Sequence, residues 1–358
     1  MKICVYAIAL NESIHVKRFV DAAKDADLIV VADTGSTDDT VKLLEAEGVF
    51  VHHISIKPWR FDDARNACLA LLPDDIDVCV SLDLDEVLQP GWREEIERVW
   101  TPGINRLYYN FDWGCGIAFK YEKIHARHGF RWFLPCHERV VPDRVTENWA
   151  TTDMLLVVHK PDPTKSRGQY LDILRASIEE NPTEARNAFY YARELSFHRR
   201  WEDSIRESER YLSLKGANWP NERCYAMRTI GRCYQELGNW DLALKWLRQA
   251  TSEASGTREP WFELAEACYR TARWGESLGA ALTCLGITER EAVYTVDPKV
   301  WGALPHDYAS IAAWNLGLFD LALKHARLAV ELDPDDLRLR QNLKFCEDKV
   351  NPPQEVAA

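Results

Sequence analysis

The feature that most constrains the fold is an aromatic position that recurs in the second half of the chain. Its members, Trp201, Trp240, Trp274 and Phe319, follow one another at intervals of 39, 34 and 45 residues. A small residue lies three positions after each aromatic residue, and another lies nine positions before it. In chain order these small pairs are Ala192 and Ser204, Gly231 and Ala243, Ala265 and Ser277, and Ser310 and Ala322. Small residues at fixed places in a recurring unit predict helix pairs that cross closely.

A unit of about 34 residues with this pattern resembles the tetratricopeptide repeat. The resemblance is closest in LGNWDLAL (237–244) and LGLFDLAL (316–323). It implies an all-α domain whose repeats share a continuous core and leave a concave face for a partner. We expect this domain over residues 164–350, followed by a flexible tail at 351–358. A generic antiparallel helical bundle is the alternative.

The first half of the chain has a different pattern, in which buried strands alternate with amphipathic helices. Apolar runs at 3–10, 28–32, 49–54 and 76–82 predict strands, and residues 13–24, 37–47 and 61–72 have helical spacing. This alternation predicts an α/β domain over residues 1–163, with a mostly parallel sheet whose strand ends share one ligand-binding edge. From about residue 105 to 159 we expect short strands and irregular aromatic segments.

Acidic residues follow two of these predicted strands. Asp33 lies at the end of the second predicted strand. It could bind a ligand there, or it could simply be part of a turn that caps the next helix. Asp83 and Asp85 follow the fourth, and if that strand continues they point the same way. Two carboxylates at a buried strand end need a cation or hydrogen-bond donors, and their hard oxygens suit Mg²⁺ or Mn²⁺. The alternative is a pair of exposed acids in a loop.

Four segments together indicate a family. ALNES (9–13), VADTGSTDDT (31–40), DDARN (62–66) and SLDLDEVL (81–88) resemble, in order and spacing, the family 2 glycosyltransferases of the GT-A fold. The resemblance implies a Rossmann-like domain that transfers a hexose from a nucleotide sugar, by family frequency a UDP-sugar. It also implies that the Asp83-Leu-Asp85 motif holds Mn²⁺ or Mg²⁺ against the donor diphosphate.

The same resemblance suggests roles for single residues. Asp33 matches the position that contacts the nucleotide base, and Asn11 and Glu12 lie on a loop that lines the nucleotide pocket. Arg65 matches a segment that supports this pocket. Asp83 is expected to reach the metal or the ribose. His159 matches a late histidine that completes the metal shell in some relatives; a hydrogen-bonded histidine between domains is the alternative.

The catalytic base is expected within LPCHERV (134–140). His137-Glu138 resembles a pair found in relatives that carry a C-terminal repeat domain. An inverting transfer needs one carboxylate to deprotonate the acceptor, and we assign this role to Glu138, with Asp112 in reserve. The alternative for Glu138 is a salt bridge with Arg131 or Arg139.

Charge and composition limit the partners. Lys plus Arg number 44 and Asp plus Glu 56, so the net charge of −12 disfavours a nucleic-acid acceptor. We therefore expect a protein or peptide acceptor first, a glycan second and a nucleic acid third. No apolar run is long enough to span a bilayer, and the ten scattered cysteines predict buried, reduced thiols in a cytoplasmic protein. A binding scaffold with an inactive transferase half remains the non-enzymatic alternative.

Overall fold

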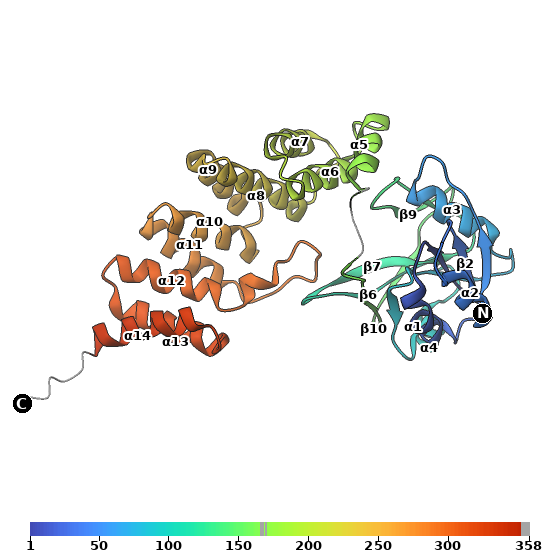
Figure 1. Cartoon of the computed structure of the whole chain (residues 1–358), viewed down its shortest axis with the longest axis horizontal. Helices are drawn as coiled ribbons and strands as arrows, with labels where there is room; N and C mark the ends of the chain where they lie inside the picture. The colour runs from blue at the N-terminus through green and yellow to red at the C-terminus, as the bar shows by residue number, and fades with distance from the viewer. Residues whose placement is uncertain (165–167, 169, 352–358) are drawn as a thin grey trace, which may run out of the picture. The chain divides into compact units, whose positions relative to one another are not determined.

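The computed structural model describes residues 1–164, 168 and 170–351, which form two compact units (Figure 1). The first unit comprises Met1–Pro182 and Ala292–Tyr294, and the second comprises Thr183–Glu291 and the chain from Thr295 onward. The predicted boundary falls between residues 163 and 164, whereas the contacts divide the chain between Pro182 and Thr183. Of the predicted tail at 351–358, residues 352–358 lie outside the described residues.

The boundary differs because the first helix after the sheet, α5 (Tyr170–Glu180), packs on the first unit. Tyr170 stacks on Phe61 and on His137, with ring centroids 6.0 and 5.8 Å apart. At the other end of α5, the Glu180 carboxylate lies 2.6 Å from the Arg60 guanidinium. Periodicity alone therefore assigns α5 to the helical half, but its aromatic and ionic contacts hold it against the α/β half.

The first unit is built on an eight-stranded sheet with the strand order β3-β2-β1-β4-β7-β6-β10-β5. Its strands are β1 (Ile3–Ala9), β2 (Leu28–Asp33), β3 (Phe50–His53), β4 (Val78–Ser81), β5 (Glu86–Leu88), β6 (Arg106–Gly114), β7 (Ile117–Ala126) and β10 (Trp149–His159). Strands β3, β2, β1 and β4 pair in parallel, as does β6 with β10. The pairs β4–β7, β7–β6 and β10–β5 are antiparallel. The sheet is thus mixed, and the expectation of a mostly parallel sheet holds only for its first half.

The stretch from 105 to 159 also differs from expectation. Besides two short strands of four residues each, it contains β6, β7 and β10, which are 9, 10 and 11 residues long. Aromatic and β-branched residues suit a pleated surface, and the row Leu107, Tyr109 and Phe111 is fully buried on one face of β6. The residues that alternate with this row, Tyr108, Asn110 and Asp112, are partly buried and of mixed polarity, which makes the sequence look irregular.

Helices cover both faces of the sheet (Figure 1). On one face α1 (Ser13–Ala23), α2 (Thr40–Ala46) and α4 (Trp92–Val99) contribute side chains to the larger core cluster. On the other face α3 (Phe61–Leu71) and the hairpin of β8 (Phe130–Phe133) and β9 (Arg139–Pro142) enclose a second core around Tyr6 and Trp132. Side chains on alternate positions of β1 enter the two cores, as the pleat requires.

The second unit consists of helix pairs, as the repeat predicts. Its helices are α6 (Ala185–Phe197), α7 (Trp201–Ser213), α8 (Pro220–Glu236), α9 (Trp240–Glu253), α10 (Arg258–Arg270), α11 (Trp274–Gly286), α12 (Leu304–Asn315), α13 (Phe319–Leu332) and α14 (Leu337–Val350), with a 3₁₀ turn η1 (Pro298–Trp301). Each recurring aromatic residue is the first residue of the second helix in a pair. The small residues are buried where the paired helices cross.

Hydrogen bonds tighten three of these crossings. The hydroxyls of Ser204, Ser277 and Ser310 donate to backbone carbonyls of the partner helix at 2.8 to 2.9 Å. At the other crossing, a Cβ atom on Gly231 would lie 2.9 Å from the Leu247 side chain. The repeated small residues therefore permit close helix contact, which is the property that identified the unit in the sequence.

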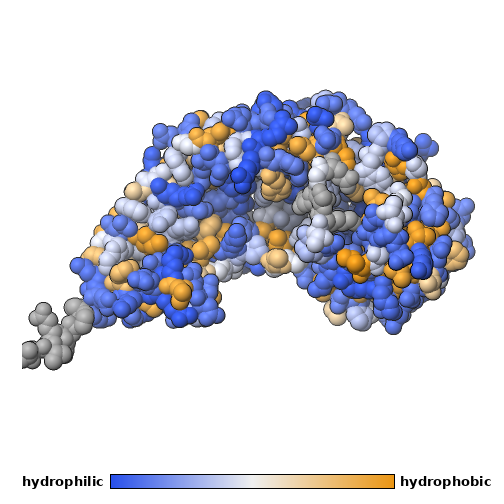
Figure 2. All heavy atoms as spheres, in the orientation of Figure 1, coloured by the Kyte–Doolittle hydropathy of each residue, from blue (hydrophilic) through white to orange (hydrophobic). Residues whose placement is uncertain are grey.

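The visible surface of both units carries mostly hydrophilic residues, with apolar ones in separate spots (Figure 2). Within the part of the chain that the structure describes, no helix is long and apolar enough to cross a membrane. All ten cysteines are free, and nine of them are buried, as predicted. Cys115, at the tip of the β6–β7 hairpin, is the exception because it is exposed.

Candidate active site

Five strands end along one edge of the sheet, and predicted functional residues lie at or just after each end. In order across the edge they are Asp33 on β2, Asn11 after β1, Asp83 after β4, Asp112 on β6 and His159 on β10. The ends point the same way because β7 runs antiparallel to both β4 and β6, which are therefore parallel to each other. Five strand-to-strand steps of about 4.8 Å make this edge roughly 24 Å long. The mixed sheet therefore still provides the predicted edge.

At one end of this edge, Asp33 and Asn11 hold the turn that follows β2. The buried Asp33 carboxylate accepts hydrogen bonds from the backbone N–H groups of Gly35 (3.0 Å) and Ser36 (3.1 Å). Asn11 Oδ1 accepts the N–H of Thr37 at 2.8 Å. Gly35 has a φ of +116°, which favours glycine and allows the chain to reverse. Both predicted residues therefore shape a backbone loop at the sheet edge.

Glu12 lies next to this loop. Its backbone N–H donates to Thr40 Oγ1 at 2.7 Å, and its carboxylate is 3.8 Å from His15 Nε2. The structure thus brings Asn11, Glu12 and Asp33 together around the same turn, although they come from different strands.

The centre of the edge is occupied by Arg65, which reaches across from α3. Its Nη2 atom lies 2.6 Å from Asp83 Oδ1, and its Nε atom lies 2.6 Å from Glu138 Oε1. The guanidinium also lies over the ring of Trp132, 4.8 Å from its centroid. One buried cation therefore joins three residues that the sequence places far apart.

Lys123, on β7, holds the same aspartate from the other side. Lys123 Nζ is 3.2 Å from Asp83 Oδ2 and 2.8 Å from Glu86 Oε1. Glu86 Oε2 in turn accepts the backbone N–H of Asp83 at 3.0 Å. All three carboxylates of this cluster (Asp83, Glu86 and Glu138) thus share two buried cations.

These contacts shift the protonation equilibria of the cluster. Burial disfavours the charged form of Asp83, but Arg65 and Lys123 hold its pKa well below the ordinary value for an aspartate. Burial raises the pKa of Glu86 to about 7, against the opposing effect of Lys123 and with help from the nearby Asp83 charge. Asp83 is therefore the carboxylate that contacts both buried cations, Arg65 and Lys123.

Asp85 faces a different partner. Its Oδ2 atom lies 3.2 Å from His159 Nε2, and its backbone carbonyl accepts the N–H of Lys160 at 2.7 Å. The antiparallel pairing of β5 with β10, in which Glu86 is opposite His159, produces this approach. Burial opposes the charged form of His159, but its hydrogen bond with Asp85 raises its pKa above the ordinary value.

The two acids of the Asp83-Leu-Asp85 motif therefore do not share one environment. Strand β4 ends at Ser81, so the alternation that would turn both side chains the same way stops before the motif. The intervening turn leads directly into β5 at Glu86. Asp83 turns toward Arg65 and Lys123, whereas Asp85 turns toward His159.

The Asp85 and His159 pair fits a divalent cation. Two ligands at about 2.1 Å and at right angles around one ion are about 3 Å apart, close to the observed 3.2 Å between Oδ2 and Nε2. Among the described residues, no group of three or more His, Cys, Asp or Glu side chains is arranged to hold a metal. A cation here would thus have two protein ligands and would complete its shell with phosphate oxygens and water, as Mg²⁺ usually does.

Both candidate bases already have hydrogen-bond or ion-pair partners. Glu138 is paired with Arg65, and not with Arg131 or Arg139 as the alternative proposed. Glu138 and Asp83 contact the same Arg65 guanidinium. Asp112 Oδ1 accepts the backbone N–H of Gly114 at 2.8 Å, at the start of the β6–β7 hairpin turn.

Sequence reasoning missed three members of this site. Lys123 and Glu86 are buried charges; Lys123 lies in a run of consecutive buried residues on β7, so no alternation along that strand marks it in the sequence. Trp113 was overlooked beside Asp112; its ring lies 4.4 Å from that of His159, and it is largely exposed. Because β6 and β10 pair in parallel with Asp112 opposite Val158, their register predicts that contact.

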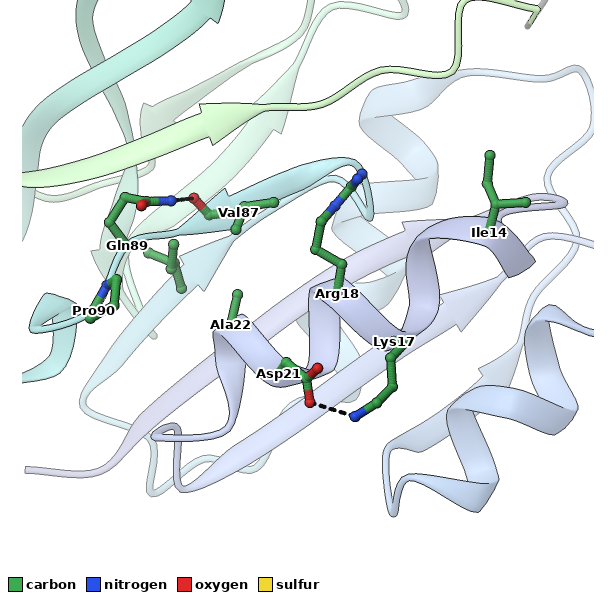
Figure 3. Close-up of a pocket in the computed structure, with 9 residues that line it drawn as sticks. Ile14, Lys17, Arg18, Asp21, Ala22, Val87, Gln89 and Pro90 are labelled. Carbon is green, nitrogen blue, oxygen red and sulfur yellow. Dashed lines mark hydrogen bonds and ion pairs between the residues drawn. The ribbon is translucent and has the colours of Figure 1, made fainter.

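An open hollow of about 490 Å³ lies elsewhere on the first unit, between α1 and the segment around β5 (Figure 3). Its walls include Ile14, Arg18, Ala22 and Gln89. Figure 3 shows a Lys17–Asp21 pair along α1 at its rim. Arg18 is engaged with the backbone carbonyl of Lys160 at 3.0 Å. None of the predicted site residues lines this hollow.

Comparison with known proteins gives a partial similarity. No family model matches the chain. Over 106 residues it is 32% identical to an uncharacterized glycosyltransferase of Rickettsia conorii and 30% identical to one of Rickettsia prowazekii. Each alignment covers 28% of this chain and 34% or 33% of the relative. The chain therefore spans about a third of the length of the curated relatives that it matches.

Among solved structures, similar chains are helical repeat proteins. YrrB, described as a TPR protein with an unusual peptide-binding site, aligns with a TM-score of 0.41 at 15% identity, over 51% of this chain and 85% of its own. MamA aligns with a TM-score of 0.38 at 12% identity, over 48% of this chain and 87% of its own. The chain is thus similar over part of its length to proteins named as glycosyltransferases, and it carries a unit of paired helices.

Proposed function

We propose that this protein is a metal-dependent, inverting glycosyltransferase that moves a hexose from a nucleotide sugar to an acceptor. The favoured donor is a UDP-sugar. The observation that carries the proposal is the row of functional side chains along one sheet edge, with Asp85 and His159 paired at 3.2 Å and a buried Arg65 paired with Asp83. The partial similarity to named glycosyltransferases supports the same reaction class.

The cation site would hold the donor diphosphate. Asp85 and His159 would provide its two protein ligands, and a histidine ligand favours Mn²⁺ over Mg²⁺. When bound, a divalent ion stabilises the negative charge that develops on the departing diphosphate. The chain itself keeps these two ligands in place through the β5–β10 pairing and the hydrogen bond from Lys160 to the Asp85 carbonyl.

Arg65 would add a second positive group for the diphosphate. Its Nη1 atom is buried and has no hydrogen-bond partner among the residues that the structure describes. A buried guanidinium with a free donor is costly unless an acceptor satisfies it. A phosphate oxygen is a suitable acceptor, because arginine binds phosphate through parallel N–H donors.

Glu138 is the proposed general base. In the inverting step the acceptor hydroxyl oxygen bonds to the anomeric carbon while the bond from that carbon to the diphosphate oxygen breaks. The hydroxyl proton passes to Glu138, and the nucleoside diphosphate leaves with the bonding electron pair. Glu138 can accept this proton only when its ion pair with Arg65 loosens, which an incoming diphosphate that competes for Arg65 would favour.

The nucleotide would lie toward the β2 end of the edge. Asp33, Asn11 and Glu12 surround the loop there, and the loop shape depends on their hydrogen bonds. We propose that this loop receives the base, with Asp83 between it and the cation site. The order of these residues along the edge follows the order of base, ribose and diphosphate in a nucleotide sugar.

The second unit is proposed to bind the acceptor, with a protein or peptide favoured over a glycan. Arg193, on α6, makes no ion pair with any described residue, and its guanidinium lies over Tyr190 (4.5 Å) and Phe197 (5.8 Å). An arginine supported by aromatic rings can bind a carboxylate or an aromatic side chain of a peptide.

The proposal is tested by incubating the full chain with single nucleotide sugars and Mn²⁺ and measuring the release of free nucleotide. We expect one donor to be hydrolysed slowly, only with the metal, and faster when the acceptor is present. The Asp85→Ala variant should release no nucleotide. Release that is equal in that variant, or that is unaffected by chelation, would contradict the proposed metal site.

A further inference from the structure

Arg18, on helix α1, connects two parts of the sheet edge. Its Nη2 atom lies 3.0 Å from the backbone carbonyl oxygen of Lys160 and 2.8 Å from His15 Nδ1. Because an arginine side chain has no acceptor, His15 Nδ1 must accept this hydrogen bond, and the ring carries its proton on Nε2. That Nε2 atom lies 3.8 Å from the Glu12 carboxylate. The first turns of α1 thus link the loop after β1 to the residue that follows β10.

This link is possible because the sheet is curled. Strands β1 and β5 are five steps apart in the strand order, which would separate them by about 24 Å in a flat sheet. Helix α1 follows β1 and nevertheless packs against β5 (Figure 3), although a helix with its side chains is only about 10 Å wide. The loop of Asn11 and Glu12 therefore lies nearer to Asp85 and His159 than the strand order alone suggests.

The carbonyl group that Arg18 binds belongs to a segment that also holds the candidate cation site. The N–H of Lys160 donates to the backbone carbonyl of Asp85 at 2.7 Å, and the preceding residue, His159, is opposite Glu86 in the β10–β5 pairing. The backbone of Lys160 is thus held by Asp85 through its N–H and by Arg18 through its carbonyl oxygen. A shift of this segment would move His159 relative to Asp85.

The His159 ring has little other polar support. A histidine that binds a metal commonly donates its second ring N–H to a carboxylate, a carbonyl group or water, which fixes the orientation of the ring. Nδ1 of His159 is buried and has no hydrogen-bond partner within the described part of the chain. The ring contacts Trp113, with 4.4 Å between centroids, but this contact is not a hydrogen bond. The position of the ring therefore depends on the backbone that carries it.

We propose that Arg18 is a positioning residue of the cation site, an inference that rests on the proposed function. By holding the Lys160 carbonyl, it keeps Asp85 Oδ2 and His159 Nε2 near the 3.2 Å separation that suits a shared divalent ion. Its bond to His15 anchors the same guanidinium to the helix that begins at the loop proposed to receive the base. The cation ligands are therefore held from the nucleotide end of the site.

Arg93 provides a matched control. It is on α4 and, like Arg18, donates to a backbone carbonyl of another segment, that of Asp25 at 2.6 Å. It also pairs with Asp27 and Glu97. Asp25 and Asp27 precede β2, so these contacts lie at the opposite edge of the sheet from the candidate site. Loss of Arg93 therefore removes a comparable contact without touching the cation ligands.

The test measures how much Mn²⁺ the chain needs in order to bind UDP. UDP is titrated by calorimetry at a series of Mn²⁺ concentrations into the full chain and its Arg18→Met, Arg18→Lys and Arg93→Met variants. Methionine keeps an unbranched apolar stem in the wall of the hollow but removes every donor. We expect Arg18→Met to raise the half-saturating Mn²⁺ concentration about 10-fold, as loss of a residue that supports a metal ligand does, and to leave UDP affinity at saturating Mn²⁺ within about twofold. Arg18→Lys keeps one donor and should raise it about threefold.

A second readout distinguishes positioning from a general loss of structure. A histidine ligand favours Mn²⁺ over Mg²⁺, so a displaced His159 should lower the ratio of half-saturating Mg²⁺ to half-saturating Mn²⁺ in Arg18→Met. A partly unfolded protein would bind less UDP per chain and keep this ratio. Arg93→Met should keep both the ratio and the half-saturating Mn²⁺ concentration of the wild type.

The outcomes separate the two proposals. An unchanged Mn²⁺ requirement in Arg18→Met would overturn the positioning role and leave the transferase proposal intact, and so would an equal rise in Arg93→Met. If Arg18→Met does not fold, Arg18→Lys decides in the same titration, because a wild-type Mn²⁺ requirement there would overturn the role. A wild-type chain that binds no UDP in the presence of Mn²⁺ would contradict the proposed function itself.

Discussion

Arg65 Nη2 lies 2.6 Å from Asp83 Oδ1, in an ion pair between a buried guanidinium and a partly exposed carboxylate that joins helix α3 to the turn after strand β4. The same guanidinium reaches Glu138 on the β9 side of the unit. Removing the buried guanidinium would leave Asp83 with Lys123 alone and would leave Glu138 without this partner. The contact therefore couples the stability of the α/β unit to the geometry of its candidate site.

Replacing Arg65 with Leu should destabilise the first unit by about 1 to 3 kcal/mol, because two partly buried carboxylates lose their shared cation and Asp83 keeps only Lys123. Arg65→Lys should lose less, since the charge stays while the second hydrogen bond is lost. Urea unfolding curves of the full chain measure both effects. Arg98→Leu is the control, because Arg98 pairs with Glu95 at the same 2.6 Å but is exposed. Similar losses in Arg65→Leu and Arg98→Leu would show that burial of the Arg65 guanidinium contributes nothing.

Gly231→Ala should destabilise the repeat unit by about 1 to 3 kcal/mol. The new Cβ would lie 2.9 Å from both Cγ and Cδ2 of Leu247, at the crossing of α8 and α9. Gly279→Ala, in the middle of α11, is the control: it has no atom within 4 Å of its new Cβ and should stabilise its helix by about 1 kcal/mol. Thermal unfolding followed by circular dichroism should shift the two variants in opposite directions. A rise in Tm for Gly231→Ala would contradict close packing at this crossing.

The buried His125 should make the first unit sensitive to acid. Tyr6 and Ala126 bind its two ring nitrogens at 2.9 and 2.8 Å, and burial lowers its pKa to about 4 from an ordinary 6.5. The unfolded chain takes up this proton below about pH 6.5 and the folded chain only below about pH 4. The contribution of His125 is therefore fully present above pH 6.5 and declines by about 3 kcal/mol as the pH falls to 4.

This decline is measured as the difference in the free energy of unfolding between the wild type and His125→Gln, at several pH values from 7 to 4. The difference should shrink as the pH falls, because glutamine does not titrate. His128→Gln serves as the control, since His128 is exposed and bonds only the Asp74 carbonyl at 3.1 Å. A difference for His125→Gln that stays constant across this range would contradict a neutral, buried imidazole.

Much of the fold follows from local patterns in the sequence. The strands β1 to β4 and the helices between them lie where apolar runs and helical spacing predict them, within a few residues. The recurring aromatic residues mark helix starts because each repeat buries the same crossing. These features depend on neighbours that are close in sequence or recur at a fixed interval, so a single chain is enough to reveal them.

The parts that escaped prediction depend on distant partners. The stretch that forms β6 and β7 was expected as short, irregular segments, and the insertion of these strands between β4 and β10 was not predicted. Arg65 was expected to support a pocket, yet its bridge between Asp83 and Glu138 joins positions 18 and 73 residues away. The split of Asp83 from Asp85 follows from the early end of β4, which depends on the turn and not on apolar spacing. Side-chain partners across a sheet edge require the strand order, which periodicity does not supply.

Glu138→Gln should abolish transfer while the donor still binds. Glutamine keeps one oxygen that can accept the Arg65 hydrogen bond but cannot take up the acceptor proton, and loss of a general base typically costs about 10² to 10⁴ in rate. The effect should therefore appear in kcat with little change in donor affinity. Asp112→Asn is the companion variant. Full activity in Glu138→Gln together with its loss in Asp112→Asn would transfer the role to Asp112.

The central claim is that Asp85, with His159, binds the cation that holds a nucleotide diphosphate. Its most direct test is calorimetric titration of UDP into the full chain with and without Mn²⁺, in the wild type, in Asp85→Ala and in Asp153→Ala. Asp153 is an exposed acid on the same strand as His159, paired with Lys120, and provides the control. We predict Mn²⁺-dependent UDP binding that Asp85→Ala loses and Asp153→Ala keeps. Equal, metal-responsive binding in wild type and Asp85→Ala would contradict the account.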